Sequence, residues 1–116
     1  MHKTLYTSEN VATSVTSDVN TFNATKLNLM AKVTFTAGQT ESVFLLIKNI
    51  SIINGFEAKY KSYELSPLEA DSDNTGSVAD VIDVESVSAI EITVINNNST
   101  TVDLDLDVET SEMVLC

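Results

Sequence analysis

Two-residue alternation of apolar and polar side chains is the feature that most constrains this sequence. It is most regular at residues 102–109, where Val and Leu at even positions alternate with acids at odd positions. Residues 27–35 alternate in the same way, from Leu27 to Phe35. Because successive side chains of a β-strand point to opposite faces, this pattern predicts strands with one buried and one exposed face. The abundance of Val, Ile and Thr agrees, since branching at Cβ favours strands over helices.

Turn residues divide the rest of the chain into further short strands. Asn54-Gly55 predicts a hairpin because both residues tolerate positive φ, and residues 96–99 predict another. Residues 37–40 predict a turn, and the acidic segment 66–77 predicts a long loop. Turns spaced by about 8 to 12 residues predict an all-β fold, an antiparallel β-sandwich of about seven strands. The sandwich is expected to be immunoglobulin-like or jelly-roll-like.

The N-terminal residues fit two kinds of structure. Val11, Val15 and Val19 recur at every fourth position, which suits one face of a helix and equally one face of a strand. The Thr and Ser residues between them are weak helix formers. We therefore predict that residues 1–25 form an extended N-terminal arm or an edge strand, and that residues 26–116 form the β-sandwich domain.

The charge of the chain limits its partners. Six lysines and no arginine stand against 17 acids, giving a net charge of −11, and residues 64–116 contain 13 acids and no base. Nucleic acids and anionic membranes are bound through Lys and Arg, so we expect neither as a partner. The acidic half is expected to face a basic protein or a cation. The first ten residues contain no apolar run of the roughly 7 to 15 residues typical of a secretory signal, so we expect synthesis in a cytoplasm.

Residue types that carry catalysis are scarce. His2 is the only histidine and Cys116 the only cysteine, which leaves no internal disulfide and too few ligands for a structural zinc. A Ser or Cys nucleophile needs a base within hydrogen-bond reach, and His2 is the sole imidazole. The chain has no Trp and three Tyr, which disfavours a carboxylate pair working on a sugar among aromatic rings. We therefore predict a protein that is not an enzyme and has no catalytic residues.

The segment that begins at Asp71 resembles the opening of a calcium-binding loop. Asp71, Asp73 and Thr75 occupy the first, third and fifth positions, and Gly76 occupies the sixth, where a sharp turn is needed. The twelfth position, which should supply a bidentate Glu, is Ile82. A cation site with Asp71, Asp73 and Thr75 as ligands is one interpretation, and an acidic surface turn is the other. Apart from such a calcium ion we expect no cofactor.

Four acids follow one another along one face of the last predicted strand. Alternate side chains of a strand project from the same face about 7 Å apart, so these charges repel one another unless water, salt or a basic partner screens them. One interpretation is a solvated strand whose charges discourage pairing with other strand edges. The other is an electrostatic docking strip for a surface rich in Lys and Arg. The strip consists of Asp103, Asp105, Asp107 and Glu109.

Two resemblances concern the type of protein. Residues 33–49, with the sequence VTFTAGQTESVFLLIKN, resemble the strand, Gly-Gln turn, strand and Asn pattern of immunoglobulin-like β-sandwiches. A small, acidic, arginine-free all-β chain rich in Thr, Ser and Asn is also similar to bacteriophage virion accessory proteins, such as capsid decoration proteins and head or tail modules. The first resemblance implies a hairpin centred on Gly38. The second implies a non-enzymatic part of a particle.

These observations leave several functions open. The leading hypothesis is a structural virion protein, made in the host cytoplasm and located in the virion, that docks on other virion proteins such as a major capsid protein. A homo-oligomer is compatible with that role. The alternative is an immunoglobulin-like binding or adhesion module for a cell-surface protein or glycan, although few aromatic rings are present to stack on sugars. A scaffold domain unrelated to viruses is a third reading.

Overall fold

The computed structural model describes residues 1–51, 55–85 and 87–112. It contains eight β-strands and one short 3-10 helix, η1 (Pro67–Glu69), which lies between the fifth and sixth strands. None of the helices in the described residues is long and apolar enough to cross a membrane. The strands are β1 (His2–Val11), β2 (Ser14–Asn20), β3 (Ala24–Thr34), β4 (Val43–Ser51), β5 (Glu57–Leu65), β6 (Thr75–Asp83), β7 (Val87–Asn96) and β8 (Val102–Glu112).

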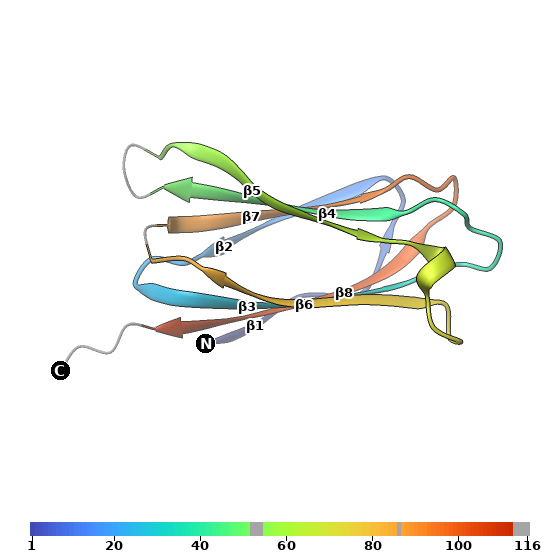
Figure 1. Cartoon of the computed structure of the whole chain (residues 1–116), viewed down its shortest axis with the longest axis horizontal. Helices are drawn as coiled ribbons and strands as arrows, with labels where there is room; N and C mark the ends of the chain where they lie inside the picture. Colours follow the sequence, from blue (N-terminus) through green and yellow to red (C-terminus); the bar gives the residue numbers. More distant parts are fainter. Residues whose placement is uncertain (52–54, 86, 113–116) are drawn as a thin grey trace.

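The strands form two antiparallel sheets that pack face to face (Figure 1). The first sheet has the order β1-β8-β3-β6, and the second sheet has the order β2-β7-β4-β5. Eight strands arranged as two such four-stranded sheets form a jelly roll. The prediction of an all-β antiparallel sandwich is therefore confirmed in its jelly-roll form, with eight strands where the sequence led us to expect about seven.

The immunoglobulin-like hairpin implied for residues 33–49 and the hairpin predicted at residues 96–99 are wrong, whereas the turn predicted at residues 37–40 is present. The resemblance of residues 33–49 implies a hairpin, yet β3 belongs to the first sheet and β4 to the second. The loop after residue 96 likewise joins β7 of the second sheet to β8 of the first. Each of these loops carries the chain across the sandwich, because the two strands that it joins bury their apolar faces from opposite sides of the core.

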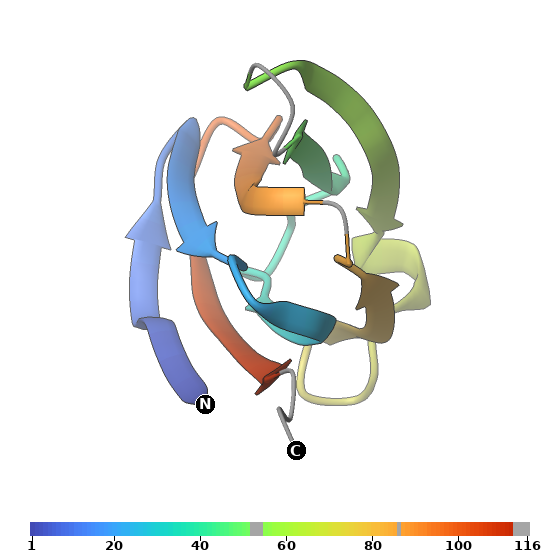
Figure 2. The same ribbon diagram turned by 90° about the vertical axis from the view of Figure 1, so that its left-hand side faces the viewer.

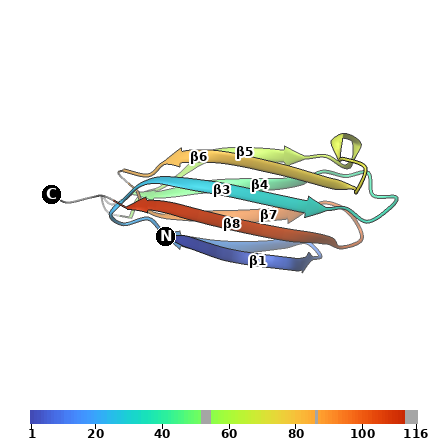
Figure 3. The ribbon, with the colours of Figure 1, turned by 90° about the horizontal axis from the view of Figure 1, so that it is seen from below.

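The N-terminal residues are part of both sheets. β1 pairs with β8 and is one edge of the first sheet, while β2 pairs with β7 and is one edge of the second (Figure 3). Val11 and Val19 are buried in the core. Of the two structures predicted for residues 1–25, the described residues show edge strands and no arm that extends away from the sandwich. Edge strands are favoured over an arm because an arm would expose Val11 and Val19 to water.

Alternation places the apolar side chains between the sheets. In β3, Leu27, Leu29, Ala31 and Val33 are buried while the intervening residues up to Lys32 are exposed. In β8, Val102, Leu104, Leu106 and Val108 are buried. Since a shift by one residue would turn each set toward water, burial fixes the register of both strands.

Two tyrosines close the open sides of the sandwich, where edge strands of different sheets run beside each other (Figure 2). On one side the Tyr6 hydroxyl of β1 accepts a hydrogen bond from Ser17 Oγ of β2. On the other side the Tyr63 hydroxyl of β5 donates to an Asp80 carboxylate oxygen of β6. A partly buried phenol usually finds such a partner, and here each partner belongs to the opposite sheet.

The predicted hairpin at Asn54-Gly55 joins β4 to β5, which pair as antiparallel neighbours. Gly55 has φ +62°, a value that glycine adopts without strain, and Asn54 lies outside the described residues. The register of the pair shifts between Ile47, which faces Lys61, and Lys48, which faces Lys59. This β-bulge turns Lys61 inward and Lys59 outward, so simple alternation does not hold along β5.

Candidate functional site

The outer face of the first sheet contains the four acids that were predicted to form a docking strip. Because the apolar residues of β8 fill the core, Asp103, Asp105, Asp107 and Glu109 all point outward. On the neighbouring strand β3 they lie in register with Thr34, Lys32, Met30 and Asn28, in that order. We call this outer surface of β1, β8, β3 and β6 the acidic face. The structure brings the predicted strip together on one surface, and its docking role stays a prediction.

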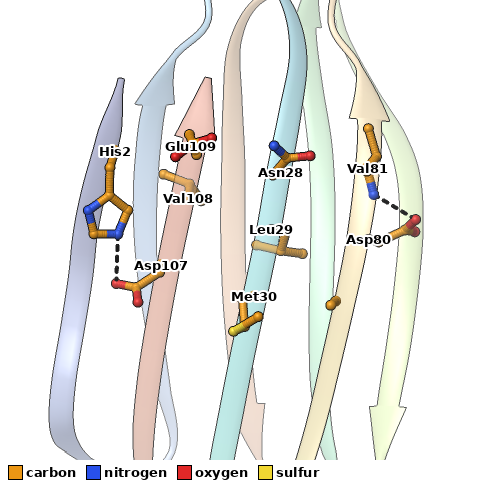
Figure 4. Close-up of a pocket in the computed structure, with 10 residues that line it drawn as sticks. His2, Asn28, Leu29, Met30, Asp80, Val81, Asp107, Val108 and Glu109 are labelled. Carbon is orange, nitrogen blue, oxygen red and sulfur yellow. Dashed lines mark hydrogen bonds and ion pairs between the residues drawn. The ribbon is translucent and has the colours of Figure 1, made fainter. Parts of the chain in front are cut away.

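An apolar hollow lies beside the strip (Figure 4). Met30 of β3 and Val81 of β6 are 59% and 58% exposed, and Ala79, which pairs with Met30, lies next to them. The hollow has a volume of about 530 Å³, and the acids Asp107 and Glu109 line its other side. An exposed apolar patch bordered by polar groups is typical of an interaction surface.

The four acids differ in their surroundings. Asp105 Oδ1 accepts a hydrogen bond of 2.9 Å from the Ser8 backbone N–H on β1. Asp107 Oδ1 lies 3.7 Å from His2 Nε2 and has no hydrogen bond to another described residue (Figure 4). Asp103 and Glu109 are exposed, whereas Asp105 and Asp107 are partly buried. The ends of the strip are therefore its most available charges.

The predicted calcium ligands form a turn closed by its own backbone. Asp71 Oδ1 accepts hydrogen bonds from the N–H groups of Asp73 and Thr75, at 2.9 and 3.0 Å. Asn74 has φ +60°, which this tight turn requires. Nothing in the described part of the chain gathers three or more His, Cys, Asp or Glu side chains that could hold a metal ion. The contacts favour the interpretation as an acidic surface turn, and a cation site stays a prediction.

A polar cluster ties the sheets together beside the hollow. Lys61 Nζ of β5 donates to Asp80 Oδ2 of β6 at 2.8 Å and lies 5.2 Å from the centre of the Tyr63 ring. Hydrogen bonds from Lys61, Tyr63 and the Val81 backbone N–H lower the pKa of Asp80 to about 2. Burial and the hydrogen bond to Asp80 raise the pKa of the Tyr63 hydroxyl well above its ordinary value. Asp80 is therefore ionised and Tyr63 neutral over the whole physiological pH range.

Acid is expected to weaken this tie. The folded-state pKa of Asp80 lies below its ordinary value of 3.8, so its ionised form stabilises the fold above that pH and the contribution is lost as pH falls through about 2. Urea unfolding of the wild type and of Asp80→Asn, from about pH 6 to about pH 2, checks this. The stability gap between the two proteins should be widest near neutral pH and close in acid. A gap independent of pH would contradict the assignment.

A second hollow, of about 460 Å³, lies between the loops that join β3 to β4 and β7 to β8. Its amide side chains already bind backbone groups across the gap. Gln39 Nε2 donates to the Thr100 and Thr101 carbonyls, and Asn98 Nδ2 donates to the Glu41 carbonyl at 2.9 Å. These hydrogen bonds hold the two loops together. A structural role therefore explains the amide side chains, and no ligand is needed to explain them.

Sequence reasoning did not single out the apolar members of the hollow. Met30 stands in the polar phase of an otherwise regular alternation, which is the signal that it faces water. Val81 is followed directly by Ile82, and two consecutive residues of a strand cannot both face the core. Which strands would bring Met30 and Val81 together depends on the pairing of β3 with β6, for which the sequence has no local signal.

No protein-family model and no curated protein sequence matches this chain. Solved structures share its fold. The Yersinia pseudotuberculosis-derived mitogen is 14% identical with a TM-score of 0.57, covering 100% of this chain and 88% of the mitogen. A carbohydrate-binding module specific for non-crystalline cellulose is 10% identical with a TM-score of 0.57, covering 97% of this chain and 73% of the module. The xylan-binding domain CBM22-1 of Paenibacillus barcinonensis Xyn10C is 10% identical with a TM-score of 0.53, covering 97% and 83%.

Structures of viral particles are also among the matches. The VP2 subviral particle of infectious bursal disease virus is one of them, with a TM-score of 0.49. The three neighbours with TM-scores above 0.5 are less than 15% identical to this chain, so the likeness establishes the β-sandwich fold alone. The fold is thus shared with a bacterial mitogen and with carbohydrate-binding modules, and function has to be argued from the surface.

Proposed function

We propose that this chain is a non-enzymatic structural protein that docks on a larger protein assembly through its acidic face. The proposed setting is a virus particle, with a major capsid protein as the partner. The small, acidic, arginine-free composition supports that setting, and the face itself supports a protein partner. No cofactor enters this role.

The observation that carries the proposal is the apolar hollow beside the acidic strip. Protein interfaces combine an apolar centre with a polar rim, and complementary charge steers the partners together. Met30, Ala79 and Val81 supply the centre, and Asp107 and Glu109 the nearest part of the rim. The partner is therefore expected to present an apolar side chain flanked by Lys or Arg.

Carbohydrate binding is the second candidate function. It is favoured by the fold, which two carbohydrate-binding modules share with TM-scores above 0.5, and by a hollow that includes Asn28, Asp107 and Glu109. Sugar rings are commonly held against aromatic faces, whose apolar surface complements the C–H face of the ring. Among the described residues that line the hollow there is no Phe, Tyr or Trp, so a protein partner fits this surface better.

Docking is expected to fail when the apolar centre is made polar. The tagged chain is produced in the cells that encode it, and its sedimentation with a high-mass particle is measured for the wild type and for Met30→Ser/Val81→Ser. We expect the double variant to lose at least about tenfold in affinity for the particle, since central apolar contacts dominate interfaces. Leu68→Ser, at a residue that is 85% exposed on η1, is the matched control and should sediment like the wild type.

The outcomes separate the two functions. Wild-type protein that sediments only as a small species, or a double variant that still joins the particle, would overturn docking through this face. Retention of the wild type on amorphous cellulose or xylan, lost on Asn28→Ala/Glu109→Ala, would instead assign the hollow to carbohydrate. Under our proposal neither polysaccharide retains the protein.

A further inference from the structure

The second sheet exposes apolar side chains on its outer face. In β4 the buried residues Val43, Leu45 and Ile47 alternate with residues that are only partly buried. A sheet that faces water on one side normally has polar residues at those outward positions. Here they are apolar, and no described element covers this side of the sheet (Figure 1). The outward apolar residues are Phe44, Leu46 and Ile50 of β4 and Ile95 of β7.

A charged row crosses the same face. The registers of the sheet place Asp18 of β2, Glu91 of β7, Lys48 of β4 and Lys59 of β5 side by side. The row is acidic on the β2 side and basic on the β5 side. Lys48 Nζ lies 3.5 Å from Glu91 Oε1 at the point where the sign changes.

We propose that two copies of this chain pack their second sheets face to face, related by a two-fold axis that runs parallel to the strands between β7 and β4. Such an axis keeps the position of each row along the strands and reverses the order of the strands within it, so that β2 faces β5 of the second copy and β7 faces β4 of the second copy. Asp18 then faces Lys59 of the second copy, and Glu91 faces Lys48 of the second copy. The charged row is therefore complementary to itself.

The other rows fit the same operation. Phe44 and Ile95 are neighbours in one row, so Phe44 faces Ile95 of the second copy and Ile95 faces Phe44 of the second copy. Leu46 faces Thr93 of the second copy, and Ile50 faces Ala89 of the second copy. The outermost acids, Glu57 and Glu64, face Asn20 and Ser14 of the second copy. No row brings two like charges together.

Other arrangements are less favourable. An axis across the strands at the height of the charged row would set Lys48 against Lys48 of the second copy, and like charges in an interface are strongly repulsive. At any other height such an axis would set the charged row against a mostly uncharged row. Pairing through the acidic face would bring two strips of four acids into one interface. With strands about 4.8 Å apart and a rise of about 3.3 Å per residue, four strands of nine residues cover about 570 Å² per copy. Two copies bury about twice that, which exceeds the roughly 1,000 Å² expected of a specific interface.

The inference does not depend on the proposed docking function, because it concerns the opposite side of the sandwich. A dimer of this geometry leaves both acidic faces exposed and pointing away from each other. Each dimer would therefore present two docking surfaces to an assembly.

Charge reversal tests the geometry. Wild-type protein is expected to sediment at about 100 µM as a species of twice the 12.6 kDa chain mass, because the buried area exceeds the roughly 1,000 Å² of a specific interface. Lys48→Glu/Lys59→Glu makes the whole row acidic, and Asp18→Lys/Glu91→Lys makes it basic. We expect each variant alone to dimerise at least about 100-fold more weakly than the wild type. Mixing the two variants should restore a dimer that contains one copy of each.

Control variants test whether the effect depends on the face that carries the substitution. Lys26→Glu/Lys32→Glu makes the same change in charge on the acidic face and should leave the wild-type dimer intact. Leu46→Asp should abolish the dimer without changing the charged row, whereas Val81→Asp, on the other face, should not. Monomeric wild-type protein, dimers of both reversed variants, or variants that stay apart when mixed would overturn the proposal.

Discussion

Replacing Leu106 with alanine is expected to lower the free energy of unfolding by about 3 kcal/mol. Leu106 lies at the centre of β8, is 0% exposed and faces the second sheet. The substitution removes apolar contacts and leaves a cavity that strands held on both sides in register cannot easily fill. Urea unfolding measures this loss. Because the chain has no Trp, unfolding is monitored by far-ultraviolet circular dichroism.

An outward position of the same strand provides the control. Asp103→Asn changes an exposed side chain of the same strand and is expected to alter stability by no more than about 0.5 kcal/mol. Equal losses for the two variants would mean that the alternation of β8 does not separate core from solvent, and the jelly-roll register would then be wrong.

Replacing Asn96 with alanine is expected to cost about 3 kcal/mol, through lost hydrogen bonds and not through lost apolar contacts. Asn96 is 5% exposed, and its Nδ2 donates to the carbonyls of Val11 and Thr100 at 3.0 and 2.9 Å. Its Oδ1 accepts from the Asn98 N–H at 3.0 Å. Truncation removes the side-chain partner of the Val11 and Thr100 carbonyls and of the Asn98 N–H at the point where β7, β8 and the β1–β2 corner meet.

Asn97→Ala is the matched control for this prediction. Its side chain is exposed and makes one long hydrogen bond of 3.4 Å to the Ser42 carbonyl. The change in unfolding free energy should stay within about 0.5 kcal/mol. If Asn96→Ala changed the unfolding free energy as little as Asn97→Ala, the Asn96 amide would not stabilise this end of the sandwich.

Regular alternation made much of the fold predictable. β3 and β8 were expected from residues 27–35 and 102–109, and the structure confirms both strands and their buried faces. These two strands lie in the interior of the first sheet, paired on both sides. Burial of one complete face leaves a single acceptable register, so local pattern and tertiary structure agree there.

Pairing partners could not be predicted in the same way. The turns at residues 37–40 and 96–99 contain the residues of hairpin turns, and both join strands of different sheets. The sheet that receives the next strand is decided by which distant strands complete the core, and turn residues do not encode that choice. The loop after β4 does form a hairpin, because β4 pairs with β5. Its turn residues resemble those of the other two loops, so turn residues alone do not distinguish a hairpin from a crossing between sheets.

The candidate site was predictable in part for the same reason. The acids of the strip belong to one strand, so alternation alone predicted that they share a face. Met30 and Val81 belong to β3 and β6, which pair with each other, and the two residues are 51 positions apart in the sequence. The charged row of the second sheet joins four strands and depends on the bulge that turns Lys59 outward. Surfaces assembled across strands become visible only with the sheet order.

Electron cryo-microscopy of the particle isolated with the tagged, full-length chain tests the central claim most directly. Our account predicts that the acidic face, with Met30 and Val81 at its centre, lies against the partner protein. A reconstruction in which that face is open to solvent while another surface contacts the particle would contradict it.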